Sequence, residues 1–132
     1  MPVTRALTLS KEERISGRKQ IEKLFGGGSR SLSAFPLRLV YLLADREPQE
    51  PAAKILVSVP KRHFKHAVKR NRVKRQVREA YRKNKHLLLE RMETAQEKTL
   101  LMAFIWLDRQ LHDSAEVDEK VCSLLQRVGE KL

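Results

Sequence analysis

Basic side chains are concentrated in one segment of the chain. Between Lys61 and Lys85 there are twelve lysine and arginine residues and one acidic residue, Glu79. The formal net charge of the whole chain is +12, so nearly all of it belongs to this segment. Ammonium and guanidinium groups bind phosphate, and a planar guanidinium can also stack on a base. The sequence therefore indicates a polyanionic partner or a membrane surface.

The spacing in this segment predicts a helix between about Phe64 and Leu89 with two different faces. At 100° per residue, the apolar side chains fall on one face, which we expect to pack on a sheet. They are Val73, Val77, Ala80, Tyr81, Leu87 and Leu88. The opposite face carries a stripe of Asn71, Arg75, Arg78 and Arg82, flanked by Lys74 and Lys85. Glu79 lies four residues from Arg75 and Lys83, so it can steady the helix without neutralising the stripe.

A charged helical stripe can also be an ordinary solvated face, but such faces mix both signs of charge. Repulsion along this stripe destabilises the helix unless phosphates offset it. A ribosomal-type RNA-binding protein, or a DNA-binding protein with a recognition helix, could use the same stripe. A membrane-surface protein would need the apolar face of the helix to be free. Because the sheet requires that face, we expect a nucleic acid as partner and no membrane.

The remaining reactive side chains do not form a recognisable catalytic or metal-binding motif. His63 and His66 lack nearby cysteine or acidic residues that would complete a metal site. The sequence shows no nucleophile triad, phosphate-binding loop or paired-carboxylate motif. Cys122 is the single cysteine, so we expect no intramolecular disulfide and a reducing, cytoplasmic location. No apolar run reaches the roughly 20 residues that span a bilayer.

The 132 residues suit one domain, whose first elements we expect to be a helix and two strands. Ser10 or Ser16 could cap the helix, which the glycines at 26–28 end. Strands are predicted at residues 37–43 and 54–59, joined as a hairpin by a polar turn. The first strand has Leu37, Leu39, Tyr41 and Leu43 on one face, and the second has Ile55, Val57 and Val59.

The last third of the chain predicts a central strand and a final helix. Residues 100–107 are apolar at nearly every position, as in a strand covered on both faces. Asp113 and Glu116 are typical of a helix start. The apolar side chains that follow at helical spacing are Val117, Val121, Leu124 and Val128. The order of elements indicates an α+β sandwich.

Three stretches together resemble the signature of the bacterial ribonuclease P protein component. They run from Ser58 to Arg62 and from Ala67 to Arg75, followed by Arg78 with Glu79. Their centre is the Arg70-Asn71-Arg72 triplet, reached from a strand through Pro60. The resemblance extends over residues 16–130, and residues 55–82 match in detail.

This resemblance implies a fold and a function. The fold would be an α-β-β(-β)-α-β-α sandwich of a small mixed sheet with helices, ribosomal protein S5 domain 2-like, with a left-handed βαβ crossover. The whole chain, 1–132, would be one domain, with the order of residues 1–14 left open. The protein would be the accessory subunit of a ribonucleoprotein endonuclease that removes the 5′ leader from precursor tRNA. The RNA subunit and its Mg2+ ions would perform the chemistry, so we expect no catalytic residue, protein-held metal or organic cofactor.

The expected partners are ribonuclease P RNA and precursor tRNA with its 5′ leader, with no obligate protein partner. The basic segment and the resemblance together give the expected RNA-binding residues. They are Lys61, Arg62, Lys65, Lys69, Arg70, Asn71, Arg72, Lys74, Arg75, Arg78 and Arg82. The resemblance also implies a cleft for the leader between the first helix and one face of the sheet, with aromatic side chains for stacking. Its expected residues are Ile21, Phe25, Leu39 and Tyr41. The sequence does not decide which face of the strand meets the leader, because Leu39 and Tyr41 could equally belong to the hydrophobic core.

Overall fold

The computed structural model describes residues 11–132 except 16, 94 and 95. Along the chain the elements are η1 (Lys11–Glu13), α2 (Arg18–Phe25), β1 (Arg30–Ala34), β2 (Leu37–Asp45), β3 (Ala53–Ser58), α3 (Ala67–Asn84), α4 (His86–Met92), β4 (Lys98–Trp106) and α5 (Ser114–Lys131). The two serines proposed as caps of the first helix, Ser10 and Ser16, lie outside the described residues. Gly17 precedes α2 with a positive φ of 94°, and Gly26 follows the helix, as the glycine cluster predicts.

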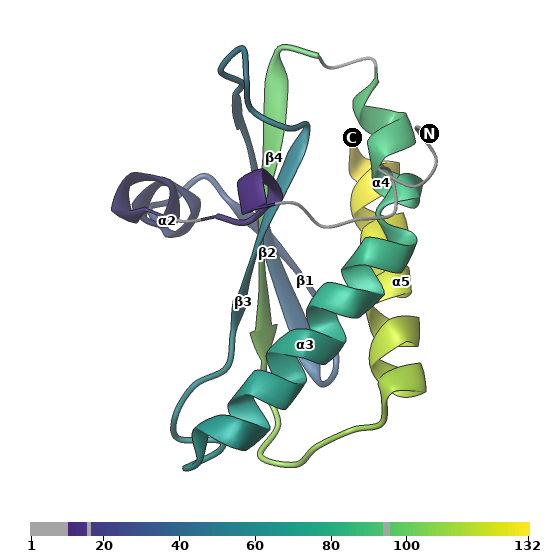
Figure 1. Ribbon diagram of the computed structural model, residues 1–132. Helices are drawn as coiled ribbons and strands as arrows, with labels where there is room; N and C mark the ends of the chain where they lie inside the picture. The colour runs from purple at the N-terminus through teal and green to yellow at the C-terminus, as the bar shows by residue number, and fades with distance from the viewer. Residues whose placement is uncertain (1–10, 16, 94–95) are drawn as a thin grey trace.

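The four strands form one mixed sheet in the order β1-β2-β4-β3. β4 pairs antiparallel with β2 and parallel with β3, and β1 pairs antiparallel with β2. α3, α4 and α5 cover one face of the sheet, and α2 lies on the other face (Figure 1). This is the α+β sandwich expected from the order of the elements.

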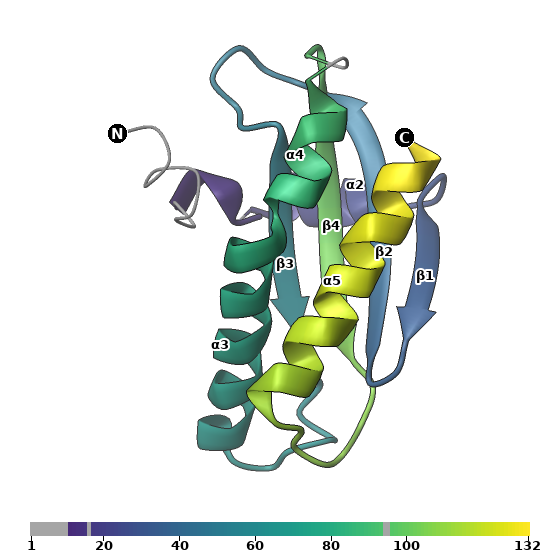
Figure 2. The same ribbon diagram turned by 90° about the vertical axis from the view of Figure 1, so that its right-hand side faces the viewer.

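The connection from β3 to β4 passes through α3 and α4. With these helices in front of the sheet, both strands run downward and β4 lies to the right of β3 (Figure 2). The crossover is therefore left-handed, which is rare among parallel βαβ units. It places α3 over the β3 edge of the sheet, where one long side of the helix stays open to solvent.

The predicted hairpin between residues 37–43 and 54–59 is wrong. β4 lies between β2 and β3, and the hairpin partner of β2 is β1. β4 is buried at seven of its nine positions by neighbours on both faces, so it takes the central place that its apolar sequence predicts. The polar turn after β2 therefore spans the width of β4. β1 has the sequence RSLSA, which is too polar to signal a strand by apolar alternation.

The main core lies between the sheet and α3, α4 and α5. β4 supplies Leu100, Met102, Phe104 and Trp106 to it, all fully buried. α3 supplies Val73, Val77, Ala80 and Tyr81, which confirms the apolar face predicted from helical spacing. A smaller cluster on the opposite face joins Leu24 of α2 to Leu101 and Ala103 of β4. Burial of its apolar face in the main core fixes the roll of α3 and hence the direction of its polar side.

The final helix is confirmed in its start and in its buried face. The Asp113 carboxylate accepts a hydrogen bond from the Glu116 backbone N–H at 3.0 Å, as an N-cap does. The four predicted apolar residues from Val117 to Val128 are fully buried. The basic helix is shorter than the expected range from about Phe64 to Leu89. α3 begins at Ala67 and ends at Asn84, and the chain then continues as α4.

Candidate nucleic-acid interface

The polar side of α3 forms one wall of an open groove of about 530 Å³. Its lining residues are Arg14, Asn71, Lys74, Arg75, Arg78, Glu79 and Arg82. The helix therefore brings the predicted stripe of Asn71, Arg75, Arg78 and Arg82 together, with Lys74 beside it. Arg14 comes from the segment before α2 and was not expected from the sequence, because it lies far outside the basic segment.

The groove retains a strong positive charge because its single acid is already paired. Glu79 accepts a hydrogen bond from Arg82 Nε at 3.1 Å, and not from Arg75 or Lys83 as spacing suggested. This bond lowers the pKa of Glu79 and raises that of Arg82. Within the described part of the chain, Arg75 and Arg78 have no acidic partner. Partial burial, and then the charge of Arg14, lower the pKa of Arg78.

Arg70 is turned away from this groove. Its Nη1 donates to the backbone carbonyls of Phe64 at 2.8 Å and Lys65 at 3.0 Å. These bonds tie the first turn of α3 to the loop that leads into it from β3. Within the Arg70-Asn71-Arg72 triplet, Arg70 therefore holds the loop, whereas Asn71 lines the groove.

The other predicted RNA-binding residues lie at the start of α3 and in the loop before it. Lys61, Arg62, Lys65, Lys69 and Arg72 are all exposed and do not line the groove. They extend the positive surface beyond its end.

Lys85 does not flank the stripe, and that part of the prediction is wrong. Its side chain is 3% exposed, and its Nζ donates to both carboxylate oxygens of Glu13, at 2.9 and 3.1 Å. α3 ends one residue earlier, so the angular projection of a continuous helix no longer applies at position 85.

A second surface lies on the other side of the sheet, where α2 packs on β2 and β4. Leu24 is buried there, Ile21 packs at the margin, and Phe25 is 47% exposed. Of the predicted cleft residues, Ile21 and Phe25 are therefore placed together beside the sheet, with the Phe25 ring accessible.

Leu39 and Tyr41 lie on the opposite face of β2 from α2, and their assignment to a cleft beside α2 is wrong. Both belong to the main core, with exposed fractions of 0% and 5%. Because side chains alternate along a strand, the positions facing α2 are 38, 40 and 42. Arg38 is exposed on that face, between Ser33 of β1 and Ile105 of β4. Both faces of β2 carry apolar residues, so alternation could not tell which one meets α2.

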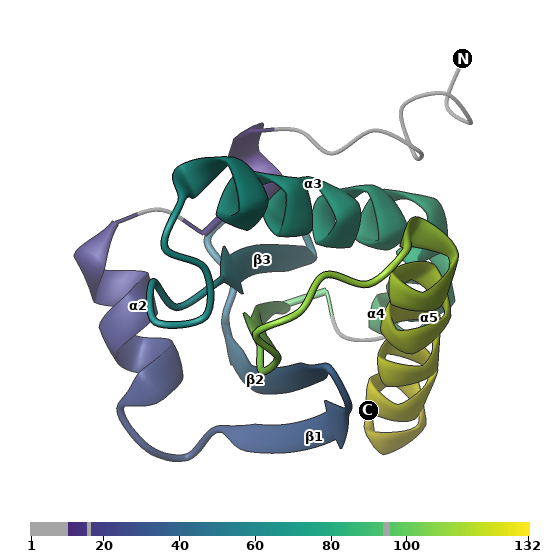
Figure 3. The same ribbon diagram turned by 90° about the horizontal axis from the view of Figure 1, so that it is seen from below.

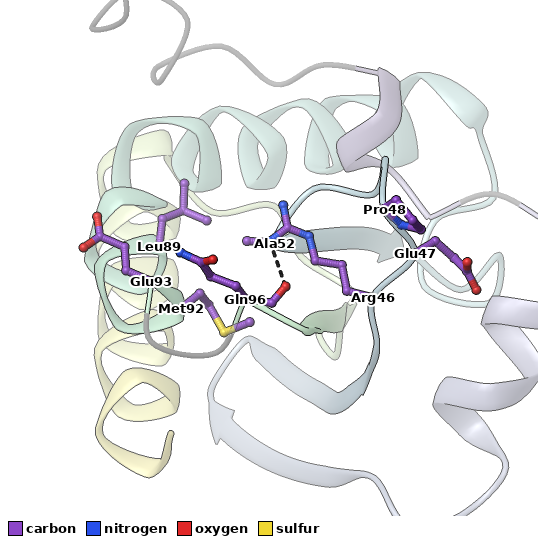
Figure 4. A pocket seen from close by; sticks show the side chains of 8 residues that line it. All are labelled: Arg46, Glu47, Pro48, Ala52, Leu89, Met92, Glu93 and Gln96. Atoms are coloured by element: carbon purple, nitrogen blue, oxygen red, sulfur yellow. Dashed lines mark hydrogen bonds between the residues drawn. The ribbon is translucent and has the colours of Figure 1, made fainter.

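A separate hollow of about 510 Å³ lies between the turn after β2 and the end of α4 (Figure 4). Arg46 crosses it, donating from Nε to the Glu50 carbonyl at 2.7 Å and from Nη1 to the Gln96 carbonyl at 3.3 Å. Leu89 and Met92 of α4 form its apolar side. The guanidinium is occupied by two backbone groups, so it holds two chain connections together.

Metal-binding clusters and membrane-spanning helices are both absent from the described residues, 11–15, 17–93 and 96–132. Among them, no three histidine, cysteine or carboxylate side chains gather where they could hold a metal ion. No helix in the same ranges combines the length and the apolar character needed to cross a membrane.

The fold and the cationic groove together define a small basic α+β protein with one exposed cationic helix. Residues 9–128 match the family model described as Ribonuclease P. The chain belongs to the ribonuclease P protein component family. The ribonuclease P protein component of Porphyromonas gingivalis is 42% identical over 121 residues, which cover 92% of this chain and 86% of that protein. That of Chlorobium phaeobacteroides is 39% identical over 83 residues, covering 61% and 56%.

Solved structures of this family share the fold. The RNase P protein from Thermotoga maritima superimposes with a TM-score of 0.64 at 23% identity, over 87% of this chain and 96% of that one. The Staphylococcus aureus RNase P protein gives 0.57 at 13% identity, over 88% and 94%. The family and the fold class expected from the Arg70-Asn71-Arg72 segment are thereby confirmed.

Proposed function

We propose that this protein binds the catalytic RNA of ribonuclease P through the groove of α3 and the 5′ leader of precursor tRNA through the surface beside α2. It thereby promotes removal of the leader, which gives the mature 5′ end of the tRNA. The bond-breaking step belongs to the RNA subunit, and the protein acts as the accessory subunit of the holoenzyme.

The observation that carries this proposal is the groove, in which Arg75 and Arg78 have no acidic partner among the described residues. Like charges placed together on a folded helix cost free energy. Phosphates of an RNA backbone would offset that cost and release counterions, which favours binding. The exposed loop and first turn of α3 can extend the same contact along the RNA.

The leader surface rests on Phe25 and the neighbouring sheet face. A half-exposed aromatic ring beside a helix and a sheet offers a platform on which an unpaired base can stack. The exposed guanidinium of Arg38 on the same sheet face is suited to a leader phosphate. We therefore replace Leu39 and Tyr41 with Arg38 in the proposed leader contact.

Mg2+ ions that serve the reaction would be held mainly by RNA. The groove offers a single carboxylate, that of Glu79, and Arg82 already binds it. A hard divalent cation prefers several oxygen ligands, which phosphates supply and this groove does not. The protein would supply binding and position, including placement of the leader.

The test is multiple-turnover cleavage of precursor tRNA by a bacterial ribonuclease P RNA at low Mg2+, with and without this protein. We expect stimulation that grows with leader length from one to several nucleotides. Tight RNA binding without stimulation would replace the proposal with a ribosomal-type RNA-binding protein. Preference for duplex DNA over structured RNA of equal charge would favour a DNA-binding role.

A further inference from the structure

The segment before α2 is fastened to the edge strand of the sheet. Arg14 forms a parallel bridge with Ile55 of β3, and the backbone N–H of Ile15 donates to the Ile55 carbonyl at 2.7 Å. The Ile15 side chain is buried in the smaller core cluster. The backbone at Arg14 is therefore held against β3, on the side of the sheet edge where α3 lies.

A buried ion pair holds the same segment one residue earlier. The Glu13 carboxylate, 14% exposed, accepts two hydrogen bonds from the ammonium group of Lys85, which follows α3. A buried ammonium group requires a charged partner, because its desolvation is otherwise costly. The pair therefore links the short helix η1 to the end of α3, and η1 lies beside α3 at the β3 edge (Figure 3).

Among the described residues 11–15, 17 and 18, Arg14 is the only basic residue that lines the groove. Its side chain is exposed, and it lines the groove together with Asn71, Arg75 and Arg78, although it comes from a different part of the chain. Its charge also adds to burial in lowering the pKa of Arg78, in keeping with two guanidinium groups that line one groove. Two guanidinium groups on opposite walls of a groove can bind one phosphate between them.

We propose that Arg14 contacts a phosphate of the RNA in the α3 groove, and that the Glu13–Lys85 ion pair is the anchor that positions it. This inference rests on the proposed function, because it assigns a further residue to the same RNA interface. The groove is thus built from two segments of the chain, and the RNA contact extends from α3 to the edge strand.

The first experiment measures binding of a bacterial ribonuclease P RNA to Arg14→Ala over a range of KCl concentrations. Loss of one phosphate contact should reduce the log-log salt slope by roughly 0.7 to 0.9 and the affinity about fivefold at 0.15 M salt. Arg18→Ala is the matched control, because Arg18 is exposed, lies outside the groove and pairs with Glu22. An unchanged slope in Arg14→Ala, or an equal loss in Arg18→Ala, would overturn the inference.

The second experiment separates positioning from general loss of structure. Glu13→Gln should lower RNA affinity in the wild-type background but not in the Arg14→Ala background, since Glu13 acts through Arg14. Glu13→Asp, which keeps the charge, should retain most of the affinity, and circular dichroism verifies folding. Equal losses in both backgrounds would overturn the anchor role. Arg75→Ala distinguishes the two proposals: if it weakens binding while Arg14→Ala does not, only this inference fails, and if neither does, the proposed function fails.

Discussion

Arg70 and Arg75 lie five residues apart on α3, and their guanidinium groups have different partners. Arg70 donates to two backbone carbonyls of the preceding loop, whereas Arg75 lines the groove without an acidic partner among the described residues. The first arrangement stabilises the folded protein, because charge-assisted hydrogen bonds to the loop are lost on unfolding. The second leaves the cation available for phosphate. The structural role of Arg70 and the binding role of Arg75 can therefore be distinguished by experiment.

We expect Arg70→Ala to lower the free energy of unfolding by about 2 kcal/mol, since hydrogen bonds to charged groups contribute about 1.5 to 3. Arg75→Ala should change it by less than about 0.5 kcal/mol, as exposed substitutions usually do. In salt titrations with ribonuclease P RNA the order should reverse, with the slope falling by roughly 0.7 to 0.9 for Arg75→Ala. Urea unfolding and RNA titration of both variants provide the measurements. Equal stability losses would contradict the different roles.

At the scale of single residues, the sequence predicted what depends on local spacing. The stripe from Asn71 to Arg82 follows from helical geometry alone and is confirmed as one wall of the groove. The positions of Arg14 and Lys85 depend on contacts with segments distant in sequence. Glu13 and Lys85 are 72 residues apart, and no periodic pattern connects them. Their pairing becomes visible only once the crossover brings the end of α3 to the N-terminal segment.

The connection from β4 to α5 is held by the His112 imidazole, which lies between two carboxylates. His112 Nδ1 lies 2.6 Å from a Glu116 carboxylate oxygen, and Nε2 lies 2.7 Å from one of Asp108. Both nitrogens can donate only when the ring is an imidazolium. Burial is the largest single effect and opposes the charge, but the two carboxylates together raise the pKa of His112 above its ordinary 6.5. The backbone carbonyl of His112 also accepts a hydrogen bond from Gln76 of α3 at 3.0 Å.

We therefore expect the contribution of His112 to stability to fall as the pH rises above about 6.5. The contribution of His112 is fully present below its unfolded pKa of about 6.5 and is lost as the pH passes its folded pKa. The hydrogen bond from His112 lowers the pKa of Asp108, so that carboxylate loses its contribution only in acid, below about 4. Thermal unfolding between pH 5.5 and 8.5 provides the test. The difference between wild type and His112→Gln should shrink with rising pH.

His86→Gln is the matched control for this measurement, because His86 is exposed at the start of α4. It should follow the wild-type pH dependence. A constant difference between wild type and His112→Gln across this range would show that the imidazolium pair contributes no pH-dependent stability.

At the scale of elements, sequence patterns identified each helix and strand with a strong apolar signal. β4 and α5 are confirmed in place and in buried face. The pairing of strands was harder, because alternation states which residues share a face and does not state which strand is the neighbour. The same limit explains why Leu39 and Tyr41 were wrongly assigned to the leader cleft. Tyr41 and Arg38 are equally compatible with a strand, and only the position of α2 shows which of them faces the second surface.

For the molecule as a whole, the sheet separates the two proposed binding surfaces. The helices α3 and α2 lie on opposite faces of the sheet (Figure 1). The groove is lined by α3, whereas Phe25 belongs to α2 and Arg38 is exposed on the face of the sheet that α2 covers. The segment around Arg14 passes the β3 edge between them, held by the bridge to Ile55. Because no residue belongs to both surfaces, substitutions on one should leave the contacts of the other intact.

We expect Phe25→Ala to weaken holoenzyme binding of precursor tRNA with a leader of several nucleotides roughly five- to tenfold, since base stacking contributes about 1 to 3 kcal/mol. With a one-nucleotide leader the effect should vanish, and binding of the protein to ribonuclease P RNA should be unchanged. Tyr41→Phe is the control for the other face of β2. The Tyr41 ring lies in the core, so removal of its hydroxyl group should leave leader binding unaltered.

Arg75→Ala should weaken assembly with the RNA equally at every leader length, and its effect should add to that of Phe25→Ala in free energy within about 0.5 kcal/mol. The measurement is holoenzyme assembly and precursor affinity for the two single variants and the double variant, at two leader lengths. Strong coupling between them would mean that a single RNA strand crosses the β3 edge and contacts both surfaces. In that case Arg14, which lies between them, would be the residue through which the coupling passes, and the coupling should disappear in Arg14→Ala.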